Sequence, residues 1–95
     1  MPFKVLVVDN EIDDLQITKM ILAGDSDFEV VTEIDSSKAI ELVRKKPNEF
    51  AAVLLDYQMP KDGLVTAKEM FAINPELQIA ILSGDQSRSV LKKSI

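Results

Sequence analysis

Residues 51–63 read AAVLLDYQMPKDG, and this stretch decides the fold. Its five uninterrupted apolar residues are enough for a strand buried on both faces and too few for a helix. The run stops at a single carboxylate, Asp56. Because ligands of open α/β sheets bind at the carboxyl ends of the strands, Asp56 is the first candidate for chemistry. A lone carboxylate there more often only satisfies backbone donors in a strand-to-helix loop.

Composition excludes several classes of protein. With 95 residues, 46% of them hydrophobic, the chain is long enough for one domain over 1–95 with one core. It contains no cysteine and no histidine, so any metal must be bound by oxygen, which suits Mg²⁺, Mn²⁺ or Ca²⁺. The net charge of −5 opposes binding of this segment to nucleic acid or anionic membranes. No apolar run approaches the roughly 20 residues of a membrane span, and no signal peptide opens the chain, so we predict a cytoplasmic protein.

Strand and helix patterns alternate along the chain. Residues 4–8 form a second β-branched apolar run that is closed by acidic residues, 28–34 have the mixed character of an edge strand, and 78–82 form a fourth apolar strand. Between and after them, spacing, caps and breakers predict helices over about 13–23, from the N-cap cluster 35–37 to Pro47, from Gly63 to Asn74, and over 87–95.

The first predicted helix has more apolar residues than one stripe needs. The set comprises Leu15, Ile17, Met20, Ile21 and Leu22. Either the helix is deeply buried, or one of its sides meets a partner. We favour deep burial, because a helix packed on a sheet often buries a broad face.

Short connections between alternating strands and helices require a parallel sheet with right-handed crossovers and helices on both faces. The carboxyl ends of the strands then meet at one edge of the sheet. Side chains that converge there are Asp9, Asn10, Glu11, Asp56 and Ser83. Since clustered carboxylates repel unless a cation or proton lies between them, this arrangement predicts a Mg²⁺ site.

These motifs resemble the receiver domain of response regulators, the phosphoacceptor domain of bacterial two-component signalling. The resemblance spans the whole chain through VLVVDNE, AVLLDYQMPKDG and NPELQIAILSG. It implies an α/β, flavodoxin-like, doubly wound parallel sheet of strand order 2-1-3-4. It also implies that the receiver domain over 1–95 is incomplete at its C-terminal end, since the fifth strand and fifth helix of the family have no counterpart.

The resemblance further implies a phosphorelay function for a protein that is not an enzyme beyond self-catalysed phosphotransfer and dephosphorylation. Asp56 would accept a phosphoryl group from a sensor histidine kinase or a phosphotransfer protein. Mg²⁺ would be held by Asp56, the backbone carbonyl of Gln58, Asn10 and waters ordered by Asp9. The Ser83 hydroxyl would act as the switch that reaches the phosphoryl group. The phosphorylated form would then bind an effector domain or partner protein.

Two local departures from the family pattern support an alternative. Asn10 stands where the family usually has a second metal-binding Asp, and the loop between Met-Pro and Asp-Gly is one residue short. The alternative is a pseudo-receiver, a protein-interaction module that is not phosphorylated, but the retained Asp9, Asp56 and Ser83 argue against it. A flavodoxin-like enzyme or nucleotide binder would need a Gly- or Ser/Thr-rich phosphate cradle, whereas residues 9–14 are acidic and glycine-free.

The missing fifth strand carries an expectation about assembly. Without it, the apolar strand 78–82 becomes an edge with unpaired backbone groups, and part of one sheet face loses its cover. We therefore predict that another chain covers this edge, in a homodimer or a domain swap, or that residues 83–95 leave the family position and pack on a neighbour.

Overall fold

The computed structural model of the chain describes residues 3–24, 26–56 and 63–82, and the backbone of 90–93. It contains one sheet with the strand order β2-β1-β3-β4-β5. The strands are β1 (Phe3–Val8), β2 (Phe28–Glu33), β3 (Ala52–Asp56), β4 (Gln78–Leu82) and β5 (Val90–Lys93). The first four are parallel, so the predicted flavodoxin-like order 2-1-3-4 is confirmed.

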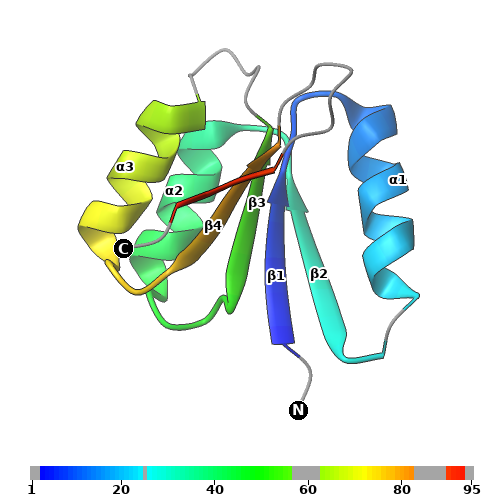
Figure 1. Cartoon of the computed structure of the whole chain (residues 1–95), viewed down its shortest axis with the longest axis horizontal. Helices are drawn as coiled ribbons and strands as arrows, with labels where there is room; N and C mark the ends of the chain where they lie inside the picture. Colours follow the sequence, from blue (N-terminus) through cyan, green and yellow to red (C-terminus); the bar gives the residue numbers. More distant parts are fainter. Residues whose placement is uncertain (1–2, 25, 57–62, 83–89, 94–95) are drawn as a thin grey trace.

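Three helices cover the sheet from two sides: α1 (Ile12–Ala23), α2 (Ser36–Lys45) and α3 (Gly63–Ile73). Figure 1 shows α1 alone on one face, with α2 and α3 together on the other. This is the doubly wound arrangement that the alternating pattern predicted. None of the helices in the described ranges is long and apolar enough to cross a membrane.

The main core lies between the sheet and the α2–α3 layer. Alternate residues of β1, β3 and β4 point into it and meet the buried stripes of the two helices: Leu6, Val8, Val53, Leu55, Ile79 and Ile81 from the strands, and Ala39, Ile40, Val43, Ala67 and Met70 from the helices. A smaller cluster on the opposite face joins Val5 and Val7 of β1 to Leu15 of α1. Strand β1 is thus buried from both sides over Val5–Val8, whereas in β3 Val53 and Leu55 are buried and Leu54 on the α1 face is only half-buried.

Helix α2 begins where the N-cap cluster predicted. The Asp35 side chain accepts hydrogen bonds from the backbone N–H groups of Ser37 at 2.8 Å and Lys38 at 3.4 Å. These bonds satisfy two of the donors that every helix leaves free at its first turn. The cap therefore fixes the start of the helix and with it the face that enters the core.

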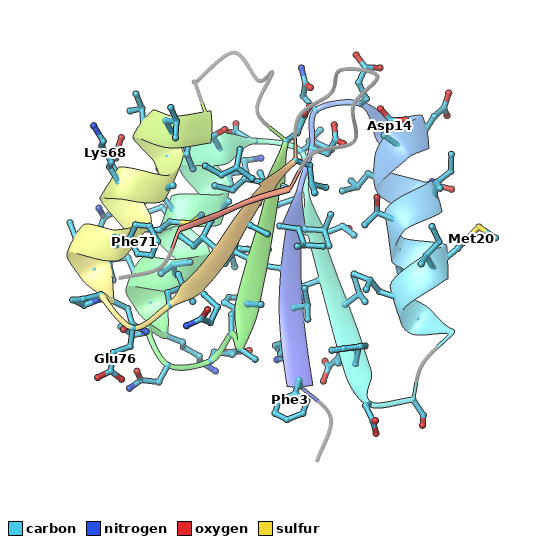
Figure 2. All side chains as sticks on the ribbon, in the orientation of Figure 1. Phe3, Asp14, Met20, Lys68, Phe71 and Glu76 are labelled. Atoms are coloured by element: carbon cyan, nitrogen blue, oxygen red, sulfur yellow. The ribbon has the colours of Figure 1, made fainter. Side chains whose placement is uncertain are left out.

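The deep burial predicted for α1 is wrong. Leu15 is buried, but Ile17 is 56% exposed, Met20 74% and Ile21 72%. Figure 2 shows Met20 pointing away from the sheet. The physical reason is that α1 packs on β2 and β1 alone, and no second helix among the described residues lies beside it on that face. The remaining alternative, that one side of the helix faces a partner, stays open.

The predicted C-terminal helix over 87–95 is also wrong where the structure describes it. Residues Val90–Lys93 form β5, which pairs antiparallel with β4, Leu82 opposite Val90 and Ile79 opposite Lys93. The parallel fifth strand of the family is absent from the described ranges. The edge of β4 is nevertheless covered, by the same chain rather than by another one. Antiparallel pairing satisfies the backbone groups of β4, which removes the reason for a homodimer or swap at this edge.

Candidate functional site

The carboxyl-terminal edge of the sheet brings two predicted site residues together. In the β1–β3 pair Val8 lies opposite Leu55; Asp9 follows β1 directly, and Asp56 is the last residue of β3. The backbone N–H of Asp9 also donates to the carbonyl oxygen of Glu33 at 3.1 Å, which extends the β1–β2 pairing by one residue. The pairing of β1 with β2 and with β3 therefore places Asp9 level with Asp56 at the end of the sheet.

The surroundings of this pair disfavour the charged form of Asp9. The pKa of Asp9 is raised from 3.8 to about 6, chiefly by burial and to a lesser extent by the charge of Asp56, a hydrogen bond with its side chain and the charge of Asp14. The Glu11 backbone N–H donates to Asp9 Oδ1 at 2.9 Å and offsets part of this rise. Two carboxylates in hydrogen-bonding contact cannot both ionise without cost, so the pair favours either a shared proton or a nearby cation.

Of the remaining predicted site residues, the structure describes only Asn10. Asn10 is exposed and follows Asp9 directly, so its amide is available at the same edge. Gln58 and Ser83 lie outside the described residues. Leu82, the residue before Ser83, lies opposite Asp56 in the β3–β4 pair. The roles of all five residues remain predictions, while the proximity of Asp9 and Asp56 is a feature of the structure.

The donor set at this edge fits a hard divalent cation. In the parts of the chain that the structure describes, no three His, Cys, Asp or Glu side chains gather at metal-binding distances. Two adjacent carboxylates and a neighbouring amide are nevertheless all-oxygen ligands, the type that Mg²⁺ prefers. A positive ion between Asp9 and Asp56 would also favour the charged form of Asp9, which burial and the charge of Asp56 disfavour. The observed pair is therefore compatible with Mg²⁺.

A groove that the sequence did not reveal lies beside α1. It encloses about 410 Å³ and is lined by side chains from α1 and from the end of β2: Ile12, Leu15, Gln16, Lys19, Met20, Thr32 and Ile34. Ile12 is 58% exposed and Ile34 49%. The only signal in the sequence was the excess of apolar residues on α1, which gives no indication of the contribution from β2.

Comparison with known proteins places these features in a family. Residues 5–95 match the family model described as response regulator receiver domain. The transcriptional regulatory protein ZraR of Escherichia coli K12 is 33% identical over 84 residues, which cover 87% of this chain and 18% of that protein. The chain thus spans less than a fifth of the length of this curated relative.

Solved structures agree with the family match. A response regulator receiver domain protein from Clostridium thermocellum is 31% identical with a TM-score of 0.82, over 90% of this chain and 68% of that one. The non-phosphorylated HemR receiver domain from Leptospira biflexa is 27% identical with a TM-score of 0.77, over 93% and 71% of the respective chains. Sequence motifs, sheet order and both comparisons lead to the same conclusion: the chain belongs to the response regulator receiver domain family of two-component systems.

Proposed function

We propose that this domain accepts a phosphoryl group on Asp56 from a sensor histidine kinase or phosphotransfer protein, and that phosphorylation changes its binding to an effector domain or partner protein in the cytoplasm. The observation that carries the proposal is the strained contact of Asp9 with Asp56 at the end of β1 and β3. Receiver domains are signalling domains of two-component systems, and this chain is one of them.

The chemistry follows from the two carboxylates. An Asp56 oxygen attacks the phosphorus, an O–P bond forms, and the P–N bond to the donor histidine breaks with its electron pair left on the nitrogen. In the metal-free domain burial raises the pKa of Asp9, and a cation bound at this edge would favour the carboxylate form of Asp9 that ligation requires. Mg²⁺, held by Asp9, Asn10, Asp56 and the Gln58 carbonyl, would supply positive charge against the phosphoryl oxygens.

The exposed side of α1 fits the docking of the phosphodonor. The helix starts three residues after Asp9, and Ile17, Met20 and Ile21 form an exposed apolar surface along it. We propose that the histidine kinase or phosphotransfer protein packs against these residues. A surface of this kind, exposed beside a reactive centre, is typical of interaction sites.

Intact-mass measurement tests the acceptor role. The wild-type domain, incubated with Mg²⁺ and acetyl phosphate, should gain the mass of one phosphoryl group, and Asp56→Asn should gain none. Chelation of Mg²⁺ should strongly reduce the adduct, and Asn10→Asp should lower the Mg²⁺ concentration required. A wild-type protein that never gains the adduct would favour the pseudo-receiver alternative, to which Asn10 already points.

A second experiment separates docking from chemistry. Met20→Glu places a charge on the exposed side of α1 without touching the core. It should leave phosphorylation by acetyl phosphate unchanged and slow transfer from a phosphorylated histidine protein at least about tenfold. Val65→Glu on α3 is the matched surface control, because it replaces an exposed apolar side chain by the same charge on the opposite side of the sheet. Equal transfer rates in all three proteins would remove α1 from the docking surface.

A further inference from the structure

The strand β2 presents a free row of backbone groups at the outer edge of the described sheet. The carbonyl oxygens of Asp27 and Glu33 accept from Phe3 and Asp9, so the odd-numbered residues direct their backbone toward β1. Because the backbone groups of successive strand residues point to alternate sides, those of Val30 and Thr32 face outward. No strand of the described ranges pairs with this side.

The outward-facing positions of β2 adjoin the groove. Val30 packs in the small cluster under α1, and Thr32 lines the groove together with Ile34. A strand added along β2 would therefore direct every second side chain toward this apolar hollow. The edge and the groove would act as one site, with backbone pairing on one side and a pocket for side chains on the other.

The charges around β2 define what the added strand must carry. Glu29 and Glu33 occupy the opposite face of β2, on the side of Val31 and α2. The Lys4 ammonium lies 3.9 Å from the Glu29 carboxylate, and the Glu33 carboxylate accepts from the backbone N–H groups of Ile34 and Asp35, but acidic side chains outnumber Lys4 on this face. Residues of an added strand that lie beside them would be favoured if basic. Lys19 stands at the groove and disfavours a second cation there, so basic residues belong on the glutamate face and apolar residues on the groove face.

A second copy of this chain does not meet these requirements. Antiparallel pairing of two β2 strands centred on Val31 would set Glu29 of each copy opposite Glu33 of the other. An in-register parallel pair would set each glutamate opposite its equivalent. Like charges directly opposite each other destabilise a strand pair, and the net charge of −5 adds to the repulsion.

We infer that the β2 edge and the adjoining groove bind an extended segment of a partner protein in which basic and apolar residues alternate. The segment adds a strand to the sheet, places its apolar side chains against Ile12, Met20 and Ile34, and places its basic side chains beside Glu29 and Glu33. This site is separate from the acidic pair at Asp9 and Asp56, and it shares Met20 with the proposed docking surface on α1.

The probe is a heptapeptide of alternating lysine and valine with capped ends. Its binding to the full chain is followed by fluorescence anisotropy. The controls are a peptide of the same composition with its valines in one block, and an alternating peptide with N-methylated valines. Two variants at one position complete the design. Thr32→Pro removes an outward N–H while sparing the pairing with β1, and Thr32→Val keeps it.

The alternating peptide should bind the wild type and Thr32→Val with equal affinity, and should bind Thr32→Pro at least about tenfold more weakly. Each control peptide should bind the wild type at least about tenfold more weakly than the alternating peptide does. Hydrogen exchange at the Val30 and Thr32 amides should slow on binding, while exchange at Val31 should not change. Ile34→Glu should weaken binding as well, which keeps the test valid if Thr32→Pro unfolds. Absent binding, equal binding of the block peptide, or unchanged edge amides would each overturn the inference.

Discussion

The helices α1 and α2 use their apolar residues in different ways. In α2 the three apolar residues that define its stripe, Ala39, Ile40 and Val43, are all buried. In α1 only Leu15 is buried, and Ile17, Met20 and Ile21 face solvent. Helix α2 thus uses its apolar residues to stabilise the fold, whereas α1 has apolar surface that folding alone does not explain.

The two helices also differ in the capping and in the charges at their ends. Asp35 caps α2 through its side chain, and Arg44 and Lys45 lie in the last turn, where the helix dipole favours positive charge. Glu11 at the start of α1 makes no side-chain cap, and no basic residue lies in its last turn. Helix α1 thus lacks the side-chain cap and the basic last turn of α2, and its favourable end charges are Asp13 and Asp14 in the first turn.

The largest expected effect tests this contrast in the core. Ile40→Ala in α2 should lower the free energy of unfolding by about 2 to 4 kcal/mol, because the Ile40 side chain is only 3% exposed and its truncation leaves a cavity in the core. Ile21→Ala in α1 makes the same chemical change at a side chain that is 72% exposed, and should change stability by less than about 0.5 kcal/mol. Urea unfolding followed by circular dichroism measures both. Equal losses would break the comparison.

A smaller effect should come from the acidic pair just before α1. The native state holds a proton on Asp9 up to about pH 6, whereas the unfolded state loses it near 3.8, so metal-free stability should fall as pH rises through this window. Asp9→Asn should remove that slope and stabilise the metal-free domain at pH 7 by about 1 to 2 kcal/mol, allowing for solvent screening of a partly exposed group.

Thermal unfolding between pH 4 and pH 7 in the presence of a chelator checks this expectation. Addition of Mg²⁺ should stabilise the wild type more than Asp9→Asn, since the variant lacks one of the two charged ligands. A stability difference between the wild type and Asp9→Asn that stays constant over this range would contradict a raised pKa of Asp9.

The helix caps should give the smallest effect. Asp35→Ala removes the two capping hydrogen bonds of α2 and should cost about 1 kcal/mol. Glu11→Ala at the start of α1 should lower the free energy of unfolding by only about 0.3 kcal/mol, because the Glu11 side chain makes no cap. Chemical denaturation of the pair can resolve this difference. A larger loss for Glu11→Ala would mean that α1 is capped in solution by a contact the structure does not show.

The sequence predicted the features that depend on local patterns. Apolar runs ending in acids placed the four parallel strands, and the meeting of strand ends placed Asp9 beside Asp56. The pattern could not show how far α1 is buried, since that depends on whether another helix lies alongside it. It also missed β5, because a four-residue strand owes its conformation to pairing with β4 rather than to its own propensity.

Chemical mapping of the phosphoryl group tests the central claim most directly. After phosphorylation with acetyl phosphate and Mg²⁺, borohydride reduction converts an aspartyl phosphate to homoserine, which peptide mass spectrometry locates in the sequence. The account predicts homoserine at position 56 and nowhere else, with none in Asp56→Asn. Homoserine at position 9, or an unmodified peptide around position 56 in a protein that carries phosphate, would contradict it.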